Sequence, residues 1–124
     1  MDRTPVTHEG TRVRLGIASA DGKVIHQHFG SATQFLIFEL EGTQLTFLAR
    51  RPTDPACRPE GHDPERFQRL LDLVSDCNVV LAAAAGPPAV AALAQRGVRL
   101  VVFPDLILNA VAKLFDQGVL ITES

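Results

Sequence analysis

Two histidines, His26 and His28, stand two positions apart in a short polar stretch between apolar runs. Side chains alternate in an extended chain, so both imidazoles would point to the same side, and neutral imidazole is the commonest metal ligand among side chains. Gly30 follows, and a glycine lets the backbone turn sharply or approach a bulky ligand closely. This spacing indicates a site for a soft metal. A polar surface turn, or a partly buried histidine that orients the turn, is the alternative interpretation.

A second group of potential ligands lies in residues 52–63, where three prolines and the lack of apolar periodicity predict a loop. Cys57 is either a ligand or an incidental loop cysteine, and His62 either joins the site or is a surface residue ahead of a helix. Three arginines lie at the loop, namely Arg50 and Arg51 just before it and Arg58 within it. They would attract an anionic ligand, or they are ordinary solubilising charges.

Signatures for other chemistry are missing from the sequence. It contains no G-x-G-x-x-G, no G-x-x-x-x-G-K-[ST], no H-E-x-x-H and no G-x-S-x-G, which argues against nucleotide-binding, zinc-protease and α/β-hydrolase chemistry. Ser31 lies near His28, but the sequence positions no acid to orient the imidazole, as an activated nucleophile would need. Serine hydrolysis is therefore not supported.

Length and composition predict one cytoplasmic domain. The chain has 124 residues, 46% of them hydrophobic, and a net charge of −2 without a basic stripe, which argues against nucleic-acid binding. Cys77 leads an apolar run and is predicted to be buried in the core, so we expect no disulfide with Cys57 and a reducing compartment. No apolar run reaches the roughly 20 residues of a membrane span. Residues 1–11 read as a disordered lead-in to a domain over residues 12–121.

Apolar patterning predicts an α/β fold. Strands are expected over 12–18, 34–40 and 44–50, the last two forming a hairpin, and then helix, strand, helix, strand and helix over 64–76, 79–83, 87–96, 98–103 and 105–118. Asp63 and Asp105 are predicted helix caps, and Gly97 a helix stop. The expected architecture is a mixed five-stranded sheet, a three-strand antiparallel meander plus two parallel strands, with helices on both faces.

Several segments resemble a known family. They are residues 16–22 (GIASADG), residues 27–32 (QHFGSA), residues 35–39 (FLIFE) and residues 76–80 (DCNVV). Over about residues 12–117 the chain resembles the nitrogenase iron–molybdenum cofactor biosynthesis accessory domain, which occurs in the NifX and NafY carriers and at the C-terminus of NifB. The resemblance implies a ribonuclease-H-like motif and a cytoplasmic protein of nitrogen fixation that is not an enzyme. Such a protein carries or shelters an iron–sulfur precursor cluster or the iron–molybdenum cofactor.

Carried over residue by residue, the resemblance places the signature histidine at His28 and a loop cysteine at Cys57. His26 stands where many relatives carry Asn or Asp, and residues 58–62 replace a glycine-rich stretch. Phe29 is mainly a core residue that could also shield one side of a cluster. The candidate cofactor-binding residues are His28, His26, Cys57, Phe29, Gly30, Ser31 and Arg58, and the candidate metal ligands are His28, His26, Cys57 and His62.

The small number of candidate ligands fits transient binding. Permanent iron–sulfur clusters are commonly held by four thiolates, whereas one thiol and a few imidazoles would favour release. The expected partners are nitrogenase cofactor-assembly proteins or apo-nitrogenase, with no nucleic acid and no membrane, and a homodimer is left open. The alternative function is a protein–protein docking domain with a vestigial metal site. A hydrolase or nuclease is suggested only by fold analogy.

Overall fold

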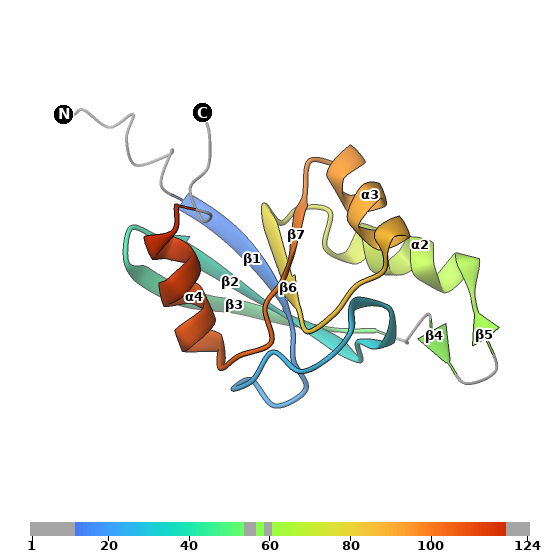
Figure 1. Cartoon of the computed structure of the whole chain (residues 1–124), viewed down its shortest axis with the longest axis horizontal. Coiled ribbons are helices and arrows are strands. Elements are labelled where there is room, and N and C mark those ends of the chain that lie inside the picture. The colour runs from blue at the N-terminus through green and yellow to red at the C-terminus, as the bar shows by residue number, and fades with distance from the viewer. Residues whose placement is uncertain (1–11, 54–56, 59–60, 119–124) are drawn as a thin grey trace.

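The computed structural model describes residues 12–53, 57–58 and 61–118, and only the backbone of residues 57, 58, 61 and 62. The lead-in predicted for residues 1–11 lies outside the described residues. Within them, the predicted α/β architecture is confirmed (Figure 1).

Five strands form one mixed sheet in the order β3-β2-β1-β6-β7. β1 pairs antiparallel with β2 and β2 pairs antiparallel with β3, while β6 and β7 run parallel to β1, as predicted. The strands span Arg12–Ala18 (β1), Gln34–Glu41 (β2), Gln44–Pro52 (β3), Val79–Ala82 (β6) and Arg99–Val102 (β7). Every residue of β6 is buried, since its apolar side chains are covered on both faces of the sheet.

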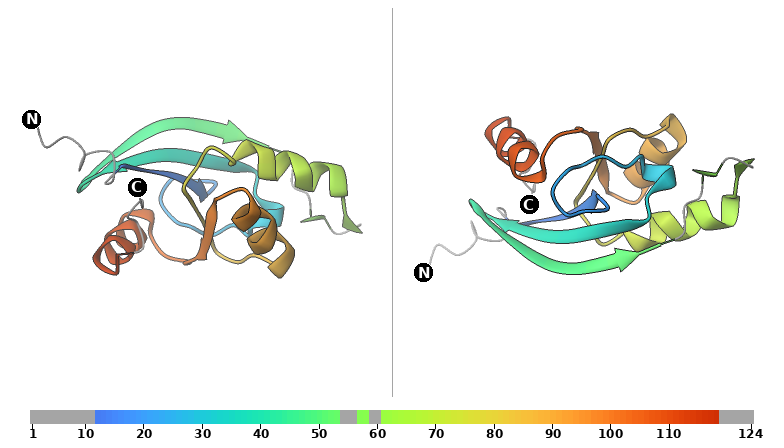
Figure 2. Two further views of the ribbon diagram at one scale, coloured as in Figure 1. Left: turned by 90° about the horizontal axis from the view of Figure 1, so that it is seen from above. Right: turned by 90° about the horizontal axis from the view of Figure 1, so that it is seen from below.

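Helices cover both faces of the sheet. In the described chain they are α2 (Pro64–Leu73), α3 (Pro87–Gln95), α4 (Ile107–Asp116) and the short 3₁₀ helix η1 (Phe29–Ser31). Alternation along β2 directs Phe35 and Ile37 into a core with α2 and α3, and Leu36 and Leu40 into a second core with α4. Figure 2 shows α2 and α4 far apart, with the twisted sheet between them.

The predicted helix signals at Asp63 and Gly97 are confirmed. Asp63 is the N-cap of α2, and its side chain accepts hydrogen bonds from the backbone N–H groups of Glu65 and Arg66. Gly97 follows the C-cap of α3 with φ +79°, a left-handed conformation that favours glycine. Helix α2 is shorter than the predicted 64–76, because Val74 already has non-helical dihedral angles.

Two local predictions are wrong. The stretch expected to be a loop holds a small ladder of β4 (Cys57–Arg58) and β5 (Gly61–His62), and strands this short leave no alternation pattern in a sequence. The N-cap of α4 is Leu106 and not Asp105. The carboxylate of Asp105 accepts the N–H of Leu106 and pairs with Lys113, so it does not bond the amides of the first helical turn.

The described chain begins and ends on one side of the molecule (Figure 1). β1 starts there and α4 finishes there, while the turn between residues 25 and 33 lies at the opposite end of β1. No helix among the described residues is long and apolar enough to cross a membrane.

Candidate functional site

The histidine turn, residues 25–33, is fixed by backbone hydrogen bonds to the segments that follow β6 and β7. Ile25 N–H donates to the carbonyl of Asp105 (2.8 Å), and Ala83 N–H donates to the carbonyl of Gln27 (2.9 Å). Phe29 N–H donates to the carbonyl of Ala84 (2.9 Å). The turn therefore sits at the carboxyl ends of the parallel strands, the edge where α/β sheets usually bind ligands.

Phe29 attaches the turn to the hydrophobic core. Its side chain is fully buried, and its ring centroid lies 5.6 Å from that of Phe35 and 6.4 Å from that of Phe67 on α2. The prediction that Phe29 is mainly a core residue is confirmed. A buried ring of this kind holds the backbone of its neighbours in place and leaves their side chains free.

His28 lies directly before η1 and its side chain is exposed. Its imidazole makes no hydrogen bond or ion pair with any residue that the structure describes, and its backbone is held by a β-bridge to Ala84. Among the described residues nothing occupies the ring of His28, so the nitrogen that carries the lone pair of the neutral ring can meet a ligand.

His26 is also exposed, but one of its nitrogens is occupied. The Nδ1 atom lies 3.0 Å from the carbonyl oxygen of Val24. A carbonyl only accepts, so Nδ1 must donate, and in the neutral ring Nε2 then carries the free lone pair. Metal-bound histidines commonly donate their second nitrogen to a carbonyl in this way, so His26 keeps a usable ligand atom.

Gln27 closes the histidine turn, a role that the sequence did not reveal. Its Nε2 donates to Oγ1 of Thr33 (3.0 Å), and its Oε1 accepts the backbone N–H of Thr33 (3.2 Å). Together these two bonds join the residues on either side of the segment that contains His28 and η1. Gln27 stands in the signature string, and its position there was the only available signal.

The Cys57 hairpin lies beside the histidine turn. The Cα atoms of β4 approach those of η1 within 8 Å, and Cys57 is the register partner of His62 in the β4–β5 ladder. Thr53 N–H donates to the carbonyl of Thr33 (3.0 Å), which ties the chain leading into the hairpin to the turn. The backbone thus brings the two groups of predicted ligands, around His28 and around Cys57, to one edge of the sheet.

The flanking arginines differ from one another. Arg51 donates to both carboxylate oxygens of Asp76 (2.7 and 2.9 Å), which raises the pKa of Arg51. The charge of Arg51 is therefore neutralised by Asp76 and is not available to a ligand. Arg50 is exposed and pairs with no acidic side chain in the described part of the chain, while the side chain of Arg58 is not described.

Cys77 is excluded as a ligand. The prediction that it is a core residue is confirmed by a side chain that is only 4% exposed. Burial, together with the nearby Asp76 carboxylate, raises the pKa of the Cys77 thiol to about 12. A thiol must lose its proton to bind a metal, so Cys77 stays a neutral packing residue.

The described side chains form no complete metal site. No three of the His, Cys, Asp and Glu side chains that the structure describes gather in one place. The start of α3 offers little to an anion, since Pro87 and Pro88 lack N–H groups and the N–H groups of Ala89 and Val90 both point to the carbonyl of Gly86. The arrangement is an open, partial ligand set at the edge of the sheet.

Comparison with known proteins assigns the family. The profile of the family described as dinitrogenase iron-molybdenum cofactor matches residues 11–118. The chain belongs to this family.

The chain is similar to proteins whose names refer to FeMo cofactor biosynthesis or to the Nif proteins. The chain is 30% identical over 105 residues to the FeMo cofactor biosynthesis protein NifB of Frankia alni, a match covering 82% of this chain and 21% of NifB. It is 32% identical over 88 residues to protein NifX of Rhodobacter capsulatus, covering 68% of this chain and 55% of NifX. The matched region is thus about a fifth of that NifB and about half of that NifX.

Solved structures share the fold. A proposed NifB protein from Thermotoga superposes with a TM-score of 0.54 at 20% identity, covering 90% of this chain and 92% of that chain. The orange protein of Desulfovibrio gigas gives a TM-score of 0.56 at 13% identity with the same coverage of both chains, 90% and 92%. These likenesses support the mixed α/β architecture, and the ribonuclease-H-like classification stays a prediction.

Proposed function

We propose that the protein binds an iron–sulfur precursor cluster or the iron–molybdenum cofactor at the histidine turn, as cargo, and hands it on unchanged. It acts without catalysis, in the cytoplasm, and its partners are nitrogenase cofactor-assembly proteins or apo-nitrogenase. His28 is the principal protein ligand. His26 and the residues of the Cys57 hairpin complete the set.

The observation that carries the proposal is the exposed imidazole of His28, which bonds to no residue in the described part of the chain and stands on a backbone held by hydrogen bonds. A ligand that is held in place loses little conformational freedom when it binds. The hairpin that contains Cys57 and His62 lies next to this turn, as a shared site requires.

A small number of ligands also suits transfer. A cluster held by a few imidazoles and one thiolate has open coordination positions. Ligands of an acceptor protein can occupy these positions before the carrier releases the cluster. Arg50, a cation on the flanking strand without a described acidic partner, supports the binding of an anionic sulfide-rich cargo. Membership of the family and the names of NifB and NifX relatives agree with this role.

Metal retention tests the proposal. The protein is mixed anaerobically with isolated iron–molybdenum cofactor, passed through a gel-filtration column and assayed for iron and molybdenum. We expect His28→Ala to lower the bound metal at a given cofactor concentration by at least about tenfold, the loss typical when a metal site is disturbed. His26→Ala should have a smaller effect, because the hairpin and His28 remain.

Gln44→Ala is the matched control, because Gln44 is an exposed polar residue of β3 paired with Glu41, beside the hairpin turn at the end of the sheet away from the histidine turn. Its metal retention should equal that of the unchanged protein. Equal retention in His28→Ala, with an unchanged circular dichroism spectrum, would refute the assignment. Capture of apo-nitrogenase by a protein that retains no metal would point instead to a docking domain.

A further inference from the structure

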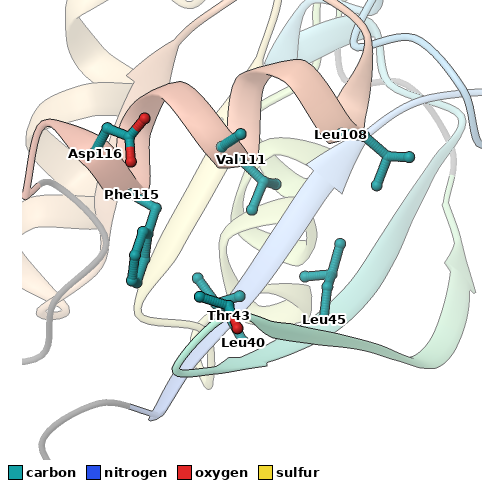
Figure 3. A pocket seen from close by; sticks show the side chains of 8 residues that line it. Leu40, Thr43, Leu45, Leu108, Val111, Phe115 and Asp116 are labelled. Carbon is teal, nitrogen blue, oxygen red and sulfur yellow. The ribbon is translucent and has the colours of Figure 1, made fainter.

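An apolar groove runs along α4, on the face of the sheet away from α2 and α3. It consists of two adjoining hollows of about 320 and 450 Å³ that share Leu108. Figure 3 shows the first hollow, with Leu108 at one end, Phe115 and Asp116 at the other, and Leu45 of the β2–β3 hairpin opposite the helix. Contiguous apolar surface of this kind marks an interaction site.

The α4 groove carries an apolar protrusion beside its first hollow. Leu108 is 72% exposed, the largest exposed fraction among the large hydrophobic residues that the structure describes. Residues three and four apart lie on the same face of a helix, so Leu108, Ala112 and Phe115 form one stripe along α4. Ala112, in the middle of the stripe, is exposed and small, which allows a second helix to approach closely. The surface thus offers both a side chain to insert and a hollow to receive one.

The two ends of the α4 groove carry opposite charges. Asp116 lines the first hollow where α4 ends. Lys23 lines the second hollow, and its backbone carbonyl accepts the N–H of Ile107 (2.8 Å), which fixes Lys23 at the start of α4. Neither Lys23 nor Asp116 has an oppositely charged partner among the described residues. Asp21 lies near Lys23, but its Oδ1 atom accepts three hydrogen bonds within its own turn.

A second copy of the chain matches both features of the α4 groove. A two-fold axis between Val111 and Ala112 would set two α4 helices antiparallel. Leu108 would then face the partner subunit's Phe115, and Lys23 would face the partner subunit's Asp116. Every contact in such an isologous interface occurs twice. One axis therefore fills the first hollow of both copies and forms two ion pairs.

We propose that two copies of the chain form a dimer through the α4 groove, with Leu108 of each copy in the first hollow of the other and Lys23 beside the partner's Asp116. The contact involves one helix and its neighbouring hairpin from each copy, and small interfaces are weak, so the dimer dissociates on dilution. The inference goes beyond the proposed function and does not depend on it, because none of residues 25–33 lines either hollow.

Sedimentation equilibrium of the full-length protein at increasing concentration tests the proposal. Leu108→Glu should weaken the dimer by at least about tenfold, because it places an unpaired charge in the partner's apolar hollow. Val90→Glu is the matched control, since Val90 is an exposed aliphatic residue of α3 outside the groove. This variant should dimerise like the unchanged protein. A protein that stays monomeric at millimolar concentration, or equal association of the two variants, would overturn the proposal.

Charge reversal tests the antiparallel arrangement of the two copies. Asp116→Lys and Lys23→Glu each place like charges at both ends of the dimer, so each variant alone should dimerise at least about tenfold more weakly. In an equimolar mixture of the two variants, a mixed dimer has opposite charges at both ends and should form about as readily as the unchanged dimer. Native mass spectrometry identifies mixed dimers by their mass. A mixture that associates no better than the separate variants would refute this arrangement.

Discussion

The backbone of His28 is held by its neighbours, while its own side chain makes no hydrogen bond within the described part of the chain. Gln27 closes the turn onto Thr33, Phe29 anchors it in the core, and the imidazole between them stays exposed. The sequence was sufficient to single out His26 and His28, since residue type and spacing are visible in it. The bonds of Gln27 were not predictable, because they depend on how the chain between Gln27 and Thr33 closes in space.

Gln27→Ala removes both hydrogen bonds that close the turn. We expect a loss of about 1–2 kcal/mol in the free energy of unfolding, measured by urea titration, together with weaker retention of the iron–molybdenum cofactor, because the His28 backbone is less fixed. Gln27→Glu is the control. Its carboxylate can still accept from the N–H of Thr33, and the Thr33 hydroxyl can rotate to donate. If Gln27→Ala binds the cofactor as well as Gln27→Glu, the turn needs no such support.

Asp76 links β1, β3 and the end of α2 through Arg14 and Arg51. The hydrogen bond from Arg51 is the main reason why the pKa of Asp76 falls to about 2 from its ordinary value of 3.8. A lowered pKa means that the ion pair adds stability above about pH 4 and loses it as the pH falls through 2. The carboxylate is 44% exposed, so solvent screening limits this contribution to about 1 kcal/mol.

Asp76→Asn should therefore lower the free energy of unfolding by about 1 kcal/mol at pH 7. The difference from the unchanged protein should shrink as the pH falls from 4 towards 2, the range set by the two pKa values. Urea titrations over this range measure it. Glu41→Gln, which breaks the exposed ion pair with Arg12, is the control and should change stability little. A constant difference down to pH 2 would contradict this account.

Among the secondary-structure elements, helix α2 holds one end of the Cys57 hairpin. β5 ends at His62, and the next residue, Asp63, is the N-cap of α2. Alternation and capping signals made the long strands and the three helices predictable from the sequence. The β4–β5 ladder was not predictable, since two-residue strands depend on partners and not on a repeating pattern.

Asp63→Ala should lower the free energy of unfolding by about 1 kcal/mol, because two amides of the first turn lose their acceptor. Thermal denaturation followed by circular dichroism measures the change. Asp116→Ala is the control, since this aspartate lies in the last turn of α4, where a negative charge opposes the helix dipole. It should leave stability unchanged or slightly higher. Equal losses in both variants would show that Asp63 does not act as a cap.

For the whole molecule, the order of the strands was predictable because a hairpin and right-handed crossovers leave few arrangements for this pattern of elements. The meeting of residues 25–33 with residues 57–62 was not predictable from local signals. It depends on Phe29 packing against Phe67 and on the hydrogen bond between Thr53 and Thr33, contacts between residues far apart in the sequence. The candidate site is thus a property of the tertiary structure, although its most prominent residue was visible in the sequence.

Both ends of the described chain lie on the side opposite the histidine turn. A tether attached at either terminus would therefore leave the imidazoles facing outward. Further chain attached at either of these two ends would therefore leave the histidine turn uncovered. Fusing a bulky fluorescent protein to either terminus should accordingly leave cofactor retention intact, whereas inserting a short linker between Ser31 and Ala32 should abolish it.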